Sequence, residues 1–253
     1  HYRFTRPEKG LIYAKEALLL SQKVKDTILM VKSANKLAIL EKENNDNTSA
    51  LRTILKSLNW AKGLNKDTLV ANTQLVAGHV YSNLQKEQAA IYNYKECLRF
   101  FKSVNDSSGI SYTYSGLGIV YYDNKKYDDA LNNYLNAEIY WANNEDALKA
   151  DLWNNIGALY IEKNDFENAR YYYNKALSFY KSENWSSEVS MVYYNLGELF
   201  LKENKIENAK ECFNKSLAIG KKIGSYTEIV WAYHGLYLTA KKAKQLHQAL
   251  KYY

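Results

Sequence analysis

Small and bulky side chains alternate along this chain with a long and almost constant period. Alanines recur at Ala50, Ala90, Ala130, Ala169, Ala209 and Ala249, and the interval between neighbours in this series never varies by more than one position. Four residues after each alanine stands a bulky side chain, namely Ile54, Tyr94, Tyr134, Tyr173, Phe213 and Tyr253. A fixed interval of this length indicates a structural unit that is repeated along the chain.

A second small side chain precedes each of the first five alanines by twelve residues. This slot holds Ala38, Gly78, Gly118, Gly157 and Gly197. Large side chains flank it four residues before and three residues after, as Tyr114 and Tyr121 do around Gly118. Spacings of three, four and seven place these side chains on one face of a helix. In the last unit Gly235 precedes Ala249 by fourteen residues, which predicts a turn that is two residues longer.

Each unit is therefore expected to be a pair of amphipathic helices joined by a polar turn. The small slots let two helices approach closely, and the rings fill the space beside them. We expect an all-α fold of stacked antiparallel helix pairs that forms a single domain over residues 1–253. The expected repeats are 67–104, 107–143, 146–183 and 186–223, with a truncated repeat at 225–253, a degenerate repeat at 26–64 and the second helix of a truncated unit at 7–23.

One unit carries a recognisable signature. The run Trp153, Ile156, Gly157, Tyr160, Ala169, Tyr173 and Ala176 resembles the tetratricopeptide repeat at each slot. The resemblance implies a right-handed α-solenoid, in which stacked units curl into a superhelix with an extended concave face. Two features depart from the family: the period exceeds the usual value of about 34 residues, and the closing proline is absent. We expect each helix to be longer by about one turn.

Long-period repeats of this kind are similar to those of bacterial sensory and regulatory proteins, in which the array precedes a kinase or DNA-binding domain. The chain opens at His1 rather than at Met and shows no signal segment. Residue 253 falls within an expected second helix. We therefore expect the chain to be a piece of a longer protein.

In the family that the repeat resembles, the first helix of each unit lines the concave face. The residues that flank the buried stripe of these helices are our candidate ligand contacts. They are Asn72, Leu75, His79, Tyr112, Ser115, Ile119, Tyr122, Asp151, Asn154, Asn155, Ala158, Tyr194, Asn195 and Glu198.

Three asparagines are the most informative of these candidates. Asn154, Asn155 and Asn195 carry amides that can donate to and accept from a peptide backbone, which favours a groove for an extended segment or a helix. The alternative is that they bond to neighbouring turns or to water. Family members that grip a free C-terminal carboxylate use paired Lys and Asn on successive first helices. Here those slots hold Leu75 with His79, and Ser115 with Ile119, so we do not expect such a ligand.

The formal charge raises the question of a nucleic-acid partner. The chain has 34 basic and 27 acidic residues, a net charge of +7. The two signs are interleaved, and the tight basic clusters are Lys221-Lys222 and Lys241-Lys242 with Lys244. We favour solvated helix faces over a phosphate-binding surface, and so expect no specific nucleic acid. No apolar run approaches the roughly 18 to 20 residues that span a bilayer.

Catalytic signatures are missing from the sequence. It contains no HExxH motif, no Walker-type glycine loop and no glycine elbow around a serine. His79 is expected to face the groove, and His234 stands in a slot that is apolar in other units. Cys97 and Cys212 lie far apart in the sequence and are expected to be buried free thiols. We expect no enzymatic activity, no cofactor and no metal.

The sequence thus predicts a non-catalytic scaffold that binds a protein or peptide, as the sensory or interaction region of a larger bacterial signalling or transcriptional regulator. The alternative is a self-associating assembly spacer, a homodimer that packs through exposed tyrosines. Nucleic-acid binding ranks third. Both a cytoplasmic location and, for part of a membrane sensor, a periplasmic one stay open at this point.

Overall fold

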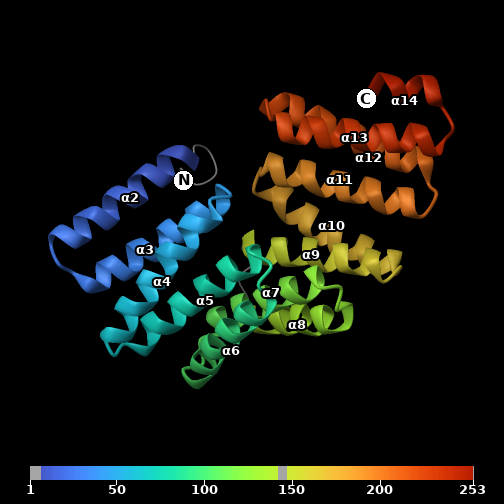
Figure 1. Ribbon diagram of the computed structural model, residues 1–253. Helices are drawn as coiled ribbons and strands as arrows, with labels where there is room; N and C mark the ends of the chain where they lie inside the picture. Colours follow the sequence, from blue (N-terminus) through green and yellow to red (C-terminus); the bar gives the residue numbers. More distant parts are fainter. Residues whose placement is uncertain (1–6, 142–146, 253) are drawn as a thin grey trace. The chain divides into compact units, whose positions relative to one another are not determined.

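The computed structural model describes residues 7–141 and 147–252, and the chain divides into two compact units, residues 1–142 and 143–253 (Figure 1). The first unit contains α2 (Pro7–Lys23), α3 (Thr27–Glu43), α4 (Asn47–Gly63), α5 (Asp67–Asn83), α6 (Glu87–Ser103), α7 (Ser107–Asp123) and α8 (Tyr127–Tyr140). The second contains α9 (Ala147–Glu162), α10 (Phe166–Ser182), α11 (Ser186–Lys202), α12 (Ile206–Ile223), α13 (Tyr226–Lys242) and α14 (Leu246–Tyr252). The described residues contain no strand, which confirms the predicted all-α fold of stacked helix pairs. Within these residues, none of the helices is long and apolar enough to cross a membrane.

The length of the repeat follows from the lengths of the helices and turns. Helices α5, α6 and α7 each have 17 residues, and three residues connect each helix to the next. Helix starts are therefore evenly spaced, at Asp67, Glu87, Ser107 and Tyr127. Two helices with their turns together span the interval between successive alanines of the repeat. Each helix is about 25 Å long at the usual rise per residue.

Asparagine and aspartate set the geometry of several turns. Asn45, Asn105 and Asn164 adopt the left-handed conformation, with φ between 53° and 60°. Asparagine tolerates this conformation better than most residues. The aspartate that follows each of them caps the next helix, and its carboxylate accepts a hydrogen bond from the backbone N–H three residues on. The Asn-Asp pair thus ends one helix and starts the next.

The glycine slots receive aromatic rings from the partner helix. A Cβ atom added to Gly157 would lie 2.7 Å from the ring of Tyr173, and one added to Gly197 would lie 2.6 Å from the ring of Phe213. Both rings are buried. The sequence predicted close approach of two helices at these slots, and the structure shows that the ring itself takes up the space left by the missing Cβ.

The prediction of a longer turn in the last helix pair is wrong. Three residues, 243–245, join α13 to α14, as in the other turns. Gly235 is the tenth residue of α13, and Gly116 is the tenth residue of α7. Both face the ring of the preceding second helix, because Gly116 lies against Tyr94 and Gly235 against Phe213. Gly235 therefore occupies the slot of Gly116, two residues before the slot of Gly118.

Within each unit, the first helices of neighbouring pairs lie side by side. Helix α3 packs against α5 and α5 against α7 in the first unit, while α9 packs against α11 and α11 against α13 in the second. No second helix in the described ranges makes a comparable contact with the next second helix. The closer spacing lies on the inside of a curve, so each unit curves with its first helices inward. We call the surface of α3, α5 and α7, and that of α9, α11 and α13, the inner surface of its unit.

Candidate ligand groove

The inner surface of the second unit carries a row of polar side chains with the period of the repeat. Asn154, Tyr194 and His234 follow one another at the repeat interval, on α9, α11 and α13. From the sequence, Gly235 was aligned with Gly118 instead of with Gly116, and this alignment placed His234 in an apolar slot. The side chain of His234 is instead exposed, and it belongs to the same row as Asn154 and Tyr194.

Two of the candidate asparagines bond to each other across neighbouring repeats. Asn195 Nδ2 on α11 donates to Asn154 Oδ1 on α9 over 2.8 Å. Asn154 is only 9% exposed, and its side-chain oxygen accepts a hydrogen bond from the neighbouring repeat. Asn155 and Asn195 are half-buried and Ala158 is half-buried beside them. The first unit contains a similar link, in which Asn35 Nδ2 on α3 donates to Thr73 Oγ1 on α5 over 3.0 Å.

Tyrosine hydroxyls hold two of the candidate carboxylates. The Tyr194 hydroxyl donates to Glu198 Oε1 over 3.0 Å, and the buried Tyr180 of α10 donates to Asp151 Oδ1. Burial and the neighbouring Glu198 carboxylate raise the pKa of Tyr194 above its usual range. Burial, followed by the charge of Asp151, does the same to the pKa of Tyr180. Both phenols therefore stay protonated and act as hydrogen-bond donors.

The Tyr194 ring is fixed by two other rings. Its centroid lies 5.4 Å from that of Phe213, on the partner helix α12, and 6.2 Å from that of Trp231, on α13. Trp231 is 45% exposed. Tyr194, Trp231 and the nearby His234 thus offer flat contact area on adjacent first helices, which suits the binding of a peptide side chain.

The candidates of the first unit form a different surface. Asn72 is exposed, whereas Leu75, Ser115 and Ile119 are half-buried. His79 Nδ1 lies 2.8 Å from the hydroxyl of the buried Tyr94. The ring of Tyr112 meets Trp141 edge to face at 5.2 Å, and Tyr122 lies 5.8 Å from Tyr127. The rings and His79 therefore contact side chains of their own unit.

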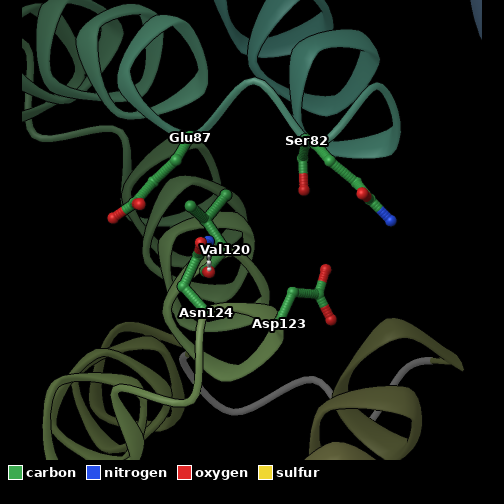
Figure 2. A pocket seen from close by; sticks show the side chains of 6 residues that line it. Ser82, Glu87, Val120, Asp123 and Asn124 are labelled. Carbon is green, nitrogen blue, oxygen red and sulfur yellow. Dashed lines mark hydrogen bonds between the residues drawn. The ribbon is translucent and has the colours of Figure 1, made fainter.

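Two hollows lie beside these surfaces. One, of about 230 Å³, lies at the turn ends of α5, α6 and α7 and is lined by Ser82, Gln85, Glu87, Val120, Asp123 and Asn124 (Figure 2). Burial raises the pKa of Asp123, while Glu87 Oε1 accepts a hydrogen bond from Lys126 Nζ over 2.6 Å. The other, of about 440 Å³, is lined by Val230, Tyr233, His234, Tyr237 and Tyr252 on α13 and α14. Its walls are largely aromatic.

Sequence reasoning missed three residues of this site. His234 and Trp231 were missed because Gly235 was aligned with the wrong slot. The regular spacing from Asn154 to Tyr194 and His234 could have revealed the correct alignment. Tyr180 was missed because a hydrogen bond between paired helices leaves no periodic signal. Among the described residues, no group of three or more His, Cys, Asp or Glu side chains is arranged to hold a metal ion.

Comparison with solved structures supports the helix-pair fold. The chain is 17% identical to a signal-transduction ATPase with a tetratricopeptide repeat sensor from Pyrococcus horikoshii, over 94% of this chain and 36% of that chain, with a TM-score of 0.78. It is 17% identical to the quorum sensor NprR from B. thuringiensis over 99% of this chain and 83% of that one, with a TM-score of 0.66. It is 19% identical to BtubC from P. vanneervenii over 87% of this chain and 93% of that one, with a TM-score of 0.71. Identities this low show the fold alone.

Two stretches of the sequence match models of a known repeat. Residues 109–182 and residues 192–219 each match a tetratricopeptide repeat model. No curated protein sequence shows significant similarity to the chain. The matched stretches contain Gly157 with Tyr173 and Gly197 with Phe213, and the helix pairs outside them repeat the same geometry. Residues 109–182 and 192–219 therefore contain tetratricopeptide repeats, and the described chain has the fold of stacked helix pairs throughout.

Proposed function

We propose that this protein is a non-catalytic scaffold that binds a peptide or protein segment on its inner surface. In our proposal it is the sensory or interaction region of a larger bacterial signalling or transcriptional regulator. Tetratricopeptide arrays use their extended concave surfaces for binding. The structural similarity to a tetratricopeptide repeat sensor and to a quorum sensor supports the sensory part of the proposal.

One observation carries the proposal. The inner surface of the second unit carries Asn155, Tyr194, Asn195 and Glu198 on adjacent first helices, all half-buried, and hydrogen bonds and a ring contact fix Tyr194, Asn195 and Glu198. Side chains that are already ordered lose little entropy when a ligand binds. Amides beside a tyrosine can bond to the backbone of an extended segment while the ring covers its side chains.

The test is peptide binding to variants of the inner surface. We would select peptides from a random displayed library on the immobilised protein, and measure the affinity of one synthetic peptide by calorimetry. The inner variant is Asn155→Ala with Tyr194→Ala. Asn154 stays in place because it is nearly buried and accepts the hydrogen bond of Asn195. The matched control is Asn174→Ala with Tyr171→Ala, which removes the same side chains from exposed positions of the second helix α10.

We expect the inner variant to lose at least tenfold in affinity, since two contacts each worth about 1 kcal/mol or more are removed. The control should bind as the wild type does. Circular dichroism would verify that both variants stay helical. Equal binding by the inner variant and the wild type would exclude this surface as the binding site.

Self-association is a second candidate function, and exposed apolar side chains favour it. Leu19 and Leu20 of α2 are 58% and 62% exposed, and Tyr226 and Val230 of α13 are 85% and 62% exposed. Apolar side chains of this kind can pack on a second copy of the chain. Light scattering over a concentration series without ligand tests this candidate: a dimer would support it, and a monomer at every concentration would contradict it.

A further inference from the structure

The inner helices are acidic although the chain as a whole is basic. The formal net charge is +7. The six first helices, α3, α5, α7, α9, α11 and α13, nevertheless contain nine acidic and seven basic residues, a net charge of −2. Several second helices have the opposite balance: α4 has three basic residues and no acidic one, and α10 and α12 each have two more basic than acidic residues. The positive charge of the chain therefore lies largely away from the inner helices.

In the second unit, the basic residues of the first helices lie away from the middle of the inner surface. Lys241 and Lys242 stand in the last turn of α13. Lys202 Nζ lies 3.0 Å from Glu162 Oε1, so this lysine is paired at the end of its helix. Lys149 Nζ lies 5.5 Å from the centroid of the Trp153 ring. Residues four apart share a helix face, and the face of Lys149 and Trp153 is opposite to the face that carries Asp151 and Asn155.

Three carboxylates lie along the inner surface of the second unit. Asp151 stands on α9, and Glu188 and Glu198 stand seven residues before and three residues after Asn195 on α11. Spacings of three and seven put these two side chains on the stripe of Asn195. Tyrosine hydroxyls donate to Asp151 and Glu198, as described above. A carboxylate has two oxygens and about four lone pairs, so one such bond does not exhaust what it can accept.

We propose that the ligand of this groove is a cationic peptide segment, whose lysine, arginine or N-terminal ammonium groups lie against Asp151 and Glu198. This inference rests on the proposed function and adds the charge of the ligand to it. Complementary charge speeds encounter and selects among partners, so an acidic peptide should be rejected by the same surface.

The experiment uses the selected peptide and two charge-neutral variants of the protein. Asp151→Asn with Glu198→Gln removes both negative charges while the amide oxygens can still accept the hydrogen bonds of Tyr180 and Tyr194. The matched control is Glu167→Gln with Glu207→Gln, which removes two exposed carboxylates from the second helices α10 and α12. The peptide is made in three forms, with its basic residues kept, replaced by glutamine or replaced by glutamate. Affinities are measured at low and high salt.

We expect the selected peptides to be rich in lysine or arginine. Replacing one basic residue by glutamine should weaken binding about two- to fivefold, the size expected for a solvent-exposed charge pair. The Asp151→Asn, Glu198→Gln protein should bind the basic peptide more weakly and should no longer distinguish it from the glutamine form. The control protein should still distinguish them.

Two results would overturn the inference in distinguishable ways. Binding that depends on Asn155 and Tyr194, but is the same for the basic, neutral and acidic peptides, would refute the cationic ligand and leave the proposed function intact. Binding that is unaffected by Asn155→Ala with Tyr194→Ala would remove the groove, and the proposed function and the inference would fail together.

Discussion

The glycine slot gives a sharp test of how the helix pairs are held together. In an ordinary helix, replacing glycine by alanine stabilises the protein by up to about 1 kcal/mol, because alanine restricts the unfolded chain and favours the helix. At Gly157 the structure predicts the opposite result. A Cβ atom added there would lie 2.7 Å from the Cδ1 and Cε1 atoms of Tyr173.

The magnitude follows from this distance. Carbon atoms in contact prefer a separation of about 3.5 to 4.0 Å, so the ring would have to move by roughly 1 Å. Tyr173 is only 1% exposed and packs within a buried cluster, so it has little room to move. Overpacking of a core costs about 1 to 3 kcal/mol. After subtraction of a helix gain of about 1 kcal/mol, we expect Gly157→Ala to lower the free energy of unfolding by up to about 2 kcal/mol.

The matched control is Gly63→Ala. Gly63 is the last residue of α4, and an added Cβ atom meets nothing within 4 Å. Urea unfolding followed by far-ultraviolet circular dichroism would measure both variants beside the wild type. The control should be unchanged or slightly more stable, about 2 kcal/mol above Gly157→Ala. If Gly157→Ala were as stable as the control, the ring would not need the space at this glycine, and the explanation of the repeated slot would be wrong.

Three further predictions concern buried polar groups. Burial raises the pKa of Glu41 above 4.5, and its Oε2 atom has no hydrogen-bond partner. Ionisation of Glu41 therefore lowers the free energy of unfolding as the pH rises above 4.5. Glu41→Gln should be more stable than the wild type in urea at neutral pH. If the variant remained more stable than the wild type below pH 4.5, this cause would be contradicted. Burial also raises the pKa of Cys97 and Cys212 to about 11. Neither thiol should therefore react with a disulfide reagent in the folded protein at mildly alkaline pH, whereas both should react in urea. Rapid labelling without urea would argue against their burial. Asn154→Ala and Asn195→Ala should show a coupling of about 0.5 to 1.5 kcal/mol in a double-mutant cycle of unfolding, whereas strictly additive losses would mean that their hydrogen bond adds nothing.

The fold could be predicted because the same steric requirement recurs in several repeats. A glycine that faces a ring, on helices of constant length joined by three-residue turns, yields a period that is visible without any structure. The one error in register came from a local ambiguity. Gly116 and Gly118 both contact rings, and α13 retains only the first of the two as Gly235.

The contacts of the groove were harder to predict because its side chains bond to residues that lie far away in the sequence. Periodicity placed Asn154 and Asn195 on first helices, but their hydrogen bond joins residues 41 positions apart. The contact between Asp151 and Tyr180 joins two helices of one pair and follows no repeated slot. Sequence can show which face a residue occupies, whereas the bonds across that face depend on helix orientation.

The most direct test of the binding proposal is to map where a bound peptide lies. A selected peptide that carries a photoreactive residue would be cross-linked to the protein, and the attached residues would be identified by mass spectrometry. Cross-links on the inner helices α9, α11 and α13, around Asn155, Tyr194 and His234, are the predicted result. Cross-links confined to the second helices α10 and α12 would contradict the binding of the peptide on the inner surface.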